Sequence, residues 1–292
     1  MDVRPVKILL QSTIPTTEDD WSIRRFSRLG DLLRVQRDDL ERPLYDVTLR
    51  DRGPPGRPDP VLSALHESSF DQLWLFAVDT GDGLTPEDCA AISRFRARGG
   101  GLLVTRDHMD LGSSVCTLGG IGGAHYFHTT NPDPDPAKRK VDDPFTTYIS
   151  WPNFHSGANG DFQEIEVIGP VHPVLADEHS PTGAIRRLPA HPHEGGVGAP
   201  EGAGARVIAQ GRSKVTGAAF NIAVAFEPGE HGGPGIAQST FHHFADYNWD
   251  TRAGCPSFVD EPPGDGMQRV PEALADTQRY ALNVAAWLSN RR

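Results

Sequence analysis

The alternation of apolar and polar stretches from the start of the chain to Gly112 predicts a repeating order of strand and helix. Apolar runs of strand length are centred on Ile8, Val47, Leu75 and Leu103, and helical or turn-forming segments separate them. This periodicity is typical of parallel strands joined by helical crossovers, with both faces of the sheet covered. We therefore expect a flavodoxin-like, doubly wound α/β fold with a mainly parallel sheet.

The stretch from Phe70 to Gly112 contains the clearest unit of this pattern. An apolar run from Leu73 to Val78 has strand length, and Thr85 with Asp88 three positions later forms a near capping box at the start of a helix. A run of three glycines ends that helix, and a second buried strand follows at Leu102 to Thr105. Strand, helix and strand together predict a right-handed crossover between parallel strands.

Hydrophobic spacing and turn signals predict the remaining elements. Further helices are expected at Trp21 to Val35, Val61 to His66 and Ser113 to Leu118, and from Pro271 to the C-terminal end. Further strands are expected at Phe162 to Ile168, Ala205 to Gln210, Ala218 to Phe226 and Ile236 to Phe241. The C-terminal half should therefore add antiparallel strands to the sheet, with the loop Gly195 to Gly204 outside the fold.

Residues 1–292 are expected to form a single α/β domain, with a core made by residues 1–120 and 160–292. The segment of about 124–160 is rich in proline, and it is too long for a plain connection in a compact domain. Its aromatic residues, Phe127, Tyr148, Trp151 and Phe154, indicate that it packs against the rest of the chain. We expect this segment to form a lid over a ligand cleft.

Polar, titratable residues follow the ends of two predicted strands. These candidate catalytic residues are Asp107, His108 and Asp110 after Thr105, and His242, His243 and Asp246 after Phe241. Ligands of open α/β sheets bind outside the carboxyl ends of the strands. If the two strands lie side by side and parallel, Asp107 and His108 face either His242 or His243, because adjacent residues point in opposite directions. A carboxylate beside an imidazole can transfer protons near neutral pH.

A second set of candidates could bind a ligand. It comprises His125, His128, Trp151 and His155. His125 and His128 have a spacing that would present two imidazoles to one metal ion on a helix, and His108, His155 or His242 could complete such a site. A metal is therefore a possible cofactor. By contrast, His191 and His193 adjoin a glycine-rich stretch and are expected to be exposed.

The composition narrows the range of partners and cofactors. A net charge of -11 without a basic stripe argues against nucleic acid and anionic membranes, so a small molecule is the expected partner, and a homo-oligomer is possible. The N-terminal stretch lacks the apolar core of a signal peptide, which predicts a cytoplasmic protein.

The glycines from Gly119 to Gly123 lack the lysine of a P-loop, and we find no nucleotide-binding motif. Three cysteines without C-x-x-C spacing indicate neither a disulfide framework nor a zinc knuckle.

Several segments resemble the class I glutamine-amidotransferase-like superfamily, and within it the ThuA-like (trehalose utilisation) group. They read FDQLWLFA, the L-T-P-E helix, GLLVTRDH, VHPVL, FHHFADYNWD and YALNVAAWLS. The resemblance implies a flavodoxin-like sheet with a pocket above the end of GLLVTRDH. Amidotransferases of the superfamily carry a cysteine directly after this strand, where this chain has Arg106, Asp107 and His108. Cys116 lies several residues further on, so the resemblance does not extend to glutamine hydrolysis.

Three hypotheses for function remain open from the sequence. The first is an enzyme that uses Asp and His acid-base chemistry on a polar small molecule such as a sugar derivative. The second is a metal-dependent hydrolase or lyase that uses the clustered histidines. The third is a non-catalytic protein that binds a ligand or partner.

Overall fold

The apolar runs pair into one large mixed sheet in the computed structural model, which describes residues 4–139, 141–142, 149 and 152–290. The sheet has the strand order β2-β1-β3-β4-β12-β11-β10-β7. Its strands are β1 (Val6–Ser12), β2 (Tyr45–Arg50), β3 (Gln72–Phe76), β4 (Gly101–Thr105), β7 (Glu166–Val167), β10 (Ala205–Arg212), β11 (Ala219–Phe226) and β12 (Gly235–Gln238). Neighbours from β2 to β12 are parallel, and neighbours from β12 to β7 are antiparallel. The α/β class, the four parallel strands of the N-terminal half and the added antiparallel strands are thereby confirmed.

Shorter strands and the helices complete the described part of the chain. Two small sheets pair β5 (His125–Tyr126) with β9 (Gly196–Val197) and β6 (Phe162–Glu164) with β8 (Arg187–Pro189). The α-helices are α1 (Ser27–Arg34), α2 (Pro86–Ala97), α3 (Asp246–Trp249), α4 (Gly266–Arg269) and α5 (Pro271–Leu288). The 3₁₀ helices are η1 (Ile23–Phe26), η2 (Leu65–Glu67), η3 (Ser113–Leu118), η4 (Gly122–Ala124), η5 (Pro136–Lys138), η6 (Pro173–Leu175), η7 (Phe241–Phe244) and η8 (Thr251–Ala253).

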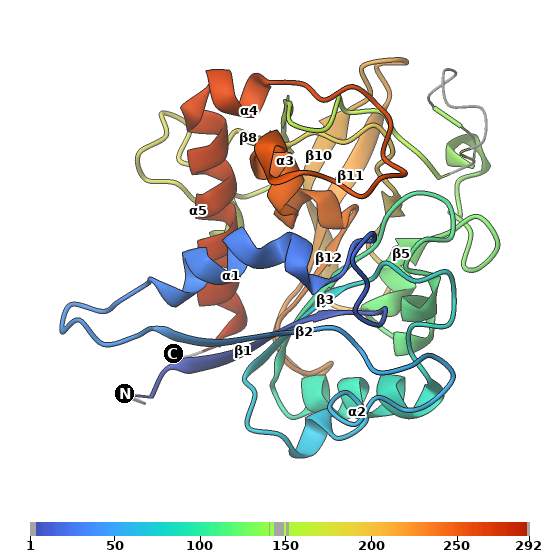
Figure 1. Cartoon of the computed structure of the whole chain (residues 1–292), viewed down its shortest axis with the longest axis vertical. Coiled ribbons are helices and arrows are strands. Elements are labelled where there is room, and N and C mark those ends of the chain that lie inside the picture. The colour runs from blue at the N-terminus through green and yellow to red at the C-terminus, as the bar shows by residue number, and fades with distance from the viewer. Residues whose placement is uncertain (1–3, 140, 143–148, 150–151, 291–292) are drawn as a thin grey trace.

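Alternate residues of the central strands face two separate hydrophobic cores. In β3, Trp74 and Phe76 belong to the core that α1 and α5 cover, whereas Leu73 and Leu75 belong to the core beneath α2. Figure 1 shows the same arrangement, with α1 and α5 on one side of the sheet and α2 on the other. Because β3 is buried on both faces, its sequence is a continuous apolar run rather than an alternating one.

Two local features of the sequence, the capping residues of α2 and the glycine at the start of β4, make specific contacts in the structure. Thr85 caps α2 by accepting the amide hydrogen of Asp88, and the Asp88 carboxylate accepts the amide hydrogen of Thr85 in return. At the start of β4, a Cβ on Gly101 would lie 2.3 Å from the carbonyl oxygen of Leu288, so only glycine lets the end of α5 come this close.

Some predicted elements are wrong in type or extent. Val61 to His66 is a turn followed by η2, because the carboxylate of Asp59 accepts the amide hydrogens of Val61 and Leu62 and holds a tight turn there. The predicted strand from Ile236 to Phe241 ends at Gln238, and the following residues form η7. The loop Gly195 to Gly204 is not outside the fold, because its first half contributes the buried strand β9.

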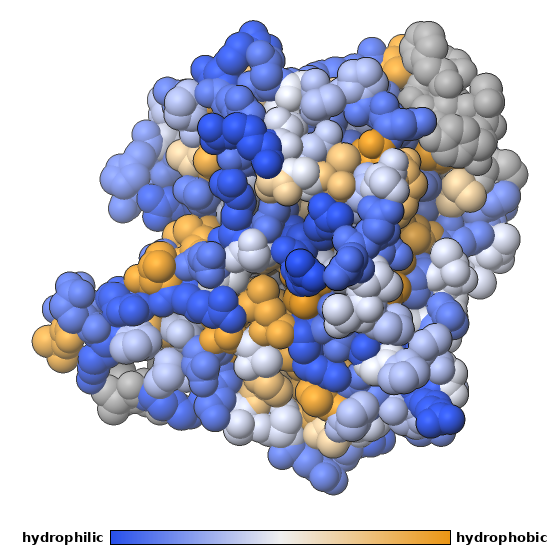
Figure 2. Space-filling model, in the orientation of Figure 1, coloured by the Kyte–Doolittle hydropathy of each residue, from blue (hydrophilic) through white to orange (hydrophobic). Residues whose placement is uncertain are grey.

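The surface carries a mixture of residue types. On the face shown in Figure 2, hydrophilic side chains predominate and apolar ones form small groups between them. Among the described residues, no helix is both long enough and apolar enough to span a lipid bilayer.

Thr85→Ala should lower the free energy of unfolding by about 1 kcal/mol, because it removes the cap of α2. Urea unfolding followed by circular dichroism measures this change. Thr85→Ser keeps the capping oxygen and should stay within roughly 0.3 kcal/mol of the wild type. Equal losses in the two variants would mean that the Thr85 methyl group, and not its hydroxyl, stabilises the helix start.

Candidate functional site

The ends of β4 and β12 bring two distant segments of the chain together. The two strands are parallel neighbours, and their last residues, Thr105 and Gln238, are paired. The pairing continues beyond the strands, because the amide of Phe241 donates to the carbonyl oxygen of Arg106 at 3.0 Å. The polar residues that follow each strand therefore emerge at the same edge of the sheet.

A tight turn after β4 positions His108. The amide of Asp107 donates to the carbonyl oxygen of Leu111, and Met109 at the tip has φ of 50°, a left-handed conformation that is uncommon for a residue with a side chain. The buried guanidinium of Arg106 donates to the carbonyl oxygen of Met109 at 2.7 Å and supports the turn from below. Such strain persists only where the surroundings fix it.

A third segment, Ala190 to Gly195 between β8 and β9, completes the site. Its backbone pairs with Phe154 through Glu194, and the amide of Gly195 donates to the carbonyl oxygen of Ser239 at 3.2 Å. A Cβ on Gly195 would lie 2.1 Å from Nη1 of Arg106, so glycine is needed for this close approach. These contacts hold His191 and His193 next to the ends of β4 and β12.

Asp107 lies at the centre of the resulting cluster. Its carboxylate accepts hydrogen bonds from Oγ1 of Thr240 at 2.8 Å and Nδ1 of His108 at 2.9 Å. Nε2 of His191 lies 3.3 Å from one carboxylate oxygen, and Nε2 of His242 lies 3.8 Å from the other. The carboxylate is almost fully buried, so its charge acts on these imidazoles through little solvent.

Two asparagines fix the orientation of the His242 and His191 imidazoles. Nδ1 of His242 donates to Oδ1 of Asn248 at 2.8 Å, and Nδ1 of His191 donates to Oδ1 of Asn159 at 3.1 Å. Asn248 in turn donates to Oδ1 of Asn159 at 2.8 Å, which links the two supports. The rings of His191 and His242 stack with centroids 3.6 Å apart. Because both Nδ1 atoms donate, each ring presents the lone pair of Nε2 toward Asp107.

Burial determines the charge of these groups. Burial lowers the pKa of His191 to about 4 and that of His193 to about 3, and it holds the pKa of His242 well below the usual value. Burial alone would raise the pKa of Asp107, but the nearby His191 and His108, together with the hydrogen bond from Nδ1 of His108, hold it well below its usual range. At neutral pH the site therefore contains the ionised carboxylate of Asp107 beside the neutral imidazoles of His191, His193 and His242.

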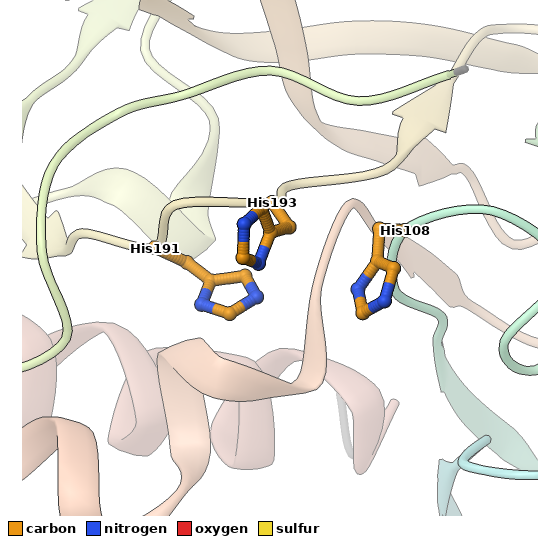
Figure 3. Close-up of side chains that lie close together, drawn as sticks. All are labelled: His108, His191 and His193. Atoms are coloured by element: carbon orange, nitrogen blue, oxygen red, sulfur yellow. The ribbon is translucent and has the colours of Figure 1, made fainter. Parts of the chain in front are cut away.

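The cluster opens into a cavity of about 230 Å³. The ligand atoms of Asp107, His191 and His242 lie within 4.8 Å of one another, as do those of His108, His191 and His193. Figure 3 shows the second group, with His108 on one segment and His191 and His193 on another, their rings turned toward a common space. Nε2 of His191 is buried without a hydrogen-bond partner. Both groups thus have the composition of a metal-ligand set.

The structure separates the two adjacent histidines that follow β12. His242 lines the cavity, whereas His243 points away from it and lies 3.5 Å from the buried carboxylate of Glu194. Asp246, expected beside them, instead accepts the amide hydrogens of Ser27 and Arg28 at the start of α1. These contacts stabilise the fold, and neither His243 nor Asp246 lines the cavity.

The other predicted site residues that the structure describes lie outside the cavity lining. Asp110 accepts the amide hydrogen of Thr129. His125 is buried in the α2 side of the fold near Arg106, and burial lowers its pKa to about 3. His128 and His155 are partly exposed, and Trp151 is outside the described residues.

The aromatic residues of the expected lid do not cover the cavity where they are described. Phe127 packs under the guanidinium of Arg106, and Phe154 stacks on Phe220 in the core. Tyr148 is outside the described residues. Ile149, from the same segment, does line the cavity.

Sequence reasoning missed His191, His193 and Glu261. The expectation that the two histidines are exposed was wrong, because both are buried. Their close spacing in A-H-P-H was the available signal, but Pro192 and His193 lie in a turn, so no strand periodicity indicated that they are buried. Glu261, whose carboxylate lies 3.6 Å from Nε2 of His193, follows η8 in an irregular stretch and gave no sequence signal.

Comparisons with known proteins show the fold alone. No family model matches the sequence, and no curated protein matches it. A solved structure described as the mmIFT52 N-terminal domain is 11% identical, covers 97% of this chain and 98% of its own, and gives a TM-score of 0.54. A putative ThuA-like protein from Parabacteroides merdae is 14% identical, with coverages of 90% and 96% and a TM-score of 0.43. The glutaminase domain of Trypanosoma brucei CTPS with bound acivicin is 13% identical, with coverages of 95% and 94% and a TM-score of 0.46. The likeness to the first supports a shared fold, and the other two are too distant for any argument about function.

Lowering the pH from 7 to 5 in the presence of EDTA should destabilise the protein. His191 and His193 are neutral in the folded protein at these pH values, but in the unfolded chain they take up protons near pH 6.5. Because the unfolded state then binds more protons, the free energy of unfolding decreases as the pH is lowered from 7 to 5. Each such histidine contributes up to roughly 1.4 kcal/mol per pH unit. Urea midpoints at pH 7, 6 and 5 measure the effect.

The control for this prediction is a pair of histidine variants. His193→Asn removes one buried imidazole and should flatten the pH dependence, whereas His179→Asn changes an exposed residue and should leave it unaltered. Equal stability at pH 7 and pH 5 in the wild type would contradict the assignment of neutral buried imidazoles.

Proposed function

We propose that this protein is a metal-dependent hydrolase of the class I glutamine-amidotransferase-like superfamily, in its ThuA-like group, and that it acts on a polar small molecule. The segments quoted from the sequence support the superfamily. The order of the parallel strands, β2-β1-β3-β4-β12, supports the flavodoxin-like description of the sheet.

The observation that carries the metal proposal is the convergence of Asp107, His191 and His242 on one cavity. The 3.3 Å between Nε2 of His191 and Oδ1 of Asp107 equals the separation of about 3.3 Å between two atoms that ligate one tetrahedral zinc ion at about 2.0 Å. Two imidazoles and a carboxylate leave a coordination position for water or substrate. The asparagines behind the imidazoles correspond to the outer partners that orient metal ligands.

The residues of the site have distinct roles in this proposal. A divalent ion would supply Lewis-acid chemistry and lower the pKa of a bound water. Asp107 contributes the negative charge that favours a cation, and Asn159 and Asn248 hold the imidazoles in the ligating tautomer. Trp21 packs its ring against His242, with centroids 4.6 Å apart, and excludes water from one wall.

Glutamine hydrolysis by a thiolate is not part of the proposal. The cavity lining contains none of the three cysteines, all of which lie in the described part of the chain. Cys116 is in η3, away from the turn after β4 where the superfamily's nucleophile would stand.

A metal-free acid-base enzyme is the second candidate, and one contact favours it. His108 is the partly exposed histidine of the cluster, and its Nδ1 lies 2.9 Å from the Asp107 carboxylate. This pair has the geometry of a general base oriented by a carboxylate. Metal binding separates the two candidates.

Protein purified without a His tag and stripped with EDTA should bind one zinc ion per chain. Isothermal titration and metal analysis of the loaded protein measure affinity and stoichiometry. His191→Ala should weaken binding by more than the roughly 10- to 100-fold that loss of an outer partner causes, whereas Asn248→Ala should fall within that range. His179→Ala, at an exposed position, is the matched control and should bind as the wild type does.

Two further variants identify the ligand set. Loss of binding in His242→Ala with retention in His193→Ala would select Asp107, His191 and His242, and the reverse result would select the group of three histidines. Binding that persists at full affinity in His191→Ala would contradict the metal proposal, because His191 belongs to both groups.

A further inference from the structure

The cavity lining combines three kinds of surface. Its floor is formed by Asp107, Asn159 and the four histidines of the cluster. The walls are apolar and consist of Trp21, Val78, Leu111, Ile149, Phe258 and Val259. Two further acidic residues, Asp20 and Glu261, also line it, and the described lining residues include no lysine or arginine. Among these described residues, an anionic ligand would find no cationic side chain.

The two additional acids are not neutralised by cations in the described part of the chain. The Asp20 carboxylate accepts the amide hydrogen of Trp21, and Arg25 donates to the carbonyl oxygen of Asp20 rather than to its carboxylate. Glu261 lies 3.6 Å from Nε2 of His193, and no lysine or arginine of the described residues pairs with it. A divalent ion on the floor would balance two of the three acidic groups and leave an excess of negative charge.

A second observation indicates that this surface is built for a ligand. Nε2 of His191 is buried, lacks a hydrogen-bond partner and belongs to a residue that lines the cavity. Such a polar atom is costly unless a ligand or ion contacts it. The volume of about 230 Å³ is below the roughly 300–1,000 Å³ of typical drug-sized pockets, so the ligand should be small.

We propose that the substrate of this cavity is a small organic amine, with its protonated nitrogen beside Glu261 and Asp20 and its apolar face against Trp21 and Phe258. This inference rests on the proposed function, since it places the bond to be cleaved over the histidine cluster. Phe258 is 58% exposed and so forms an apolar surface at the mouth, which a ligand would cover. The unbalanced acids attract a cation and repel carboxylate or phosphate groups.

Three probes with the same ring and different charge test the proposal. Benzylamine is cationic, benzyl alcohol is neutral and benzoate is anionic at pH 7. Their affinities for the EDTA-stripped protein are measured by ligand-observed NMR, and the amine should bind at least ~10-fold more tightly than benzoate. The measurement is repeated with zinc-loaded protein, where the same order of affinities should hold.

Variants identify the groups responsible. Glu261→Gln and Asp20→Asn should each weaken benzylamine binding by roughly 2- to 5-fold, the range for partly exposed ion pairs, and leave benzyl alcohol binding unchanged. Glu230→Gln changes an exposed acid outside the cavity and serves as the matched control, with no effect on any probe. Circular dichroism of each variant verifies that the fold is retained.

The proposal is overturned if benzylamine does not bind, if benzyl alcohol or benzoate binds as tightly, or if neither variant affects benzylamine. Its failure is distinguishable from failure of the metal proposal. Zinc binding that depends on His191, without a preference for the amine, would refute the substrate class and leave the metal-dependent hydrolase in place. A preference for the amine without zinc binding would support the substrate class and refute the metal proposal.

Discussion

The parallel pairing of β4 with β12 is the constraint on which the site depends. It brings Asp107 and Thr240, 133 positions apart in the chain, to a hydrogen bond of 2.8 Å. Because both strands run in the same direction, the polar residues that follow them emerge at one edge and must share the space above it. The third segment is positioned by the same pairing, since Gly195 bonds to Ser239, one residue beyond β12. The pairing joins the first two segments, and the bond from Gly195 to Ser239 adds the third.

The buried charge of Asp107 then determines what can surround it. A carboxylate with almost no solvent contact is costly unless hydrogen bonds or a nearby cation offset the loss of hydration. Thr240 and His108 provide hydrogen bonds directly, and His191 and His242 lie within reach of its two oxygens. The same burial keeps the imidazoles neutral, which suits them better to holding a cation than to storing a proton.

A second buried polar network lies behind the first and has a structural role. Glu194 is fully buried and accepts hydrogen bonds from Ser156, Gln163 and Ser239, with His243 close by. Because its oxygens have partners from three different segments, the Glu194 carboxylate fixes the backbone that carries the cavity-lining His191 and His193. Neighbouring residues of the segment Ala190 to Gly195 therefore belong to two networks. His191 and His193 line the cavity, and Glu194 belongs to the network that holds the segment in place.

The sequence by itself determined the parallel strands, the start of α2 and the polar residues at two strand ends, because each depends on local periodicity, capping or the order of elements along the chain. It also indicated Asp107 and His108 as candidates, which line the cavity, and it limited the candidate after β12 to His242 or His243. The choice of His242, and the presence of His191, His193 and Glu261 beside it, was decided only by the tertiary structure. His191, His193 and Glu261 lie in irregular segments without a period of their own. Their orientation is set by long-range contacts such as Gly195 with Ser239 and Phe154 with Glu194, and no local pattern in the sequence encodes such contacts.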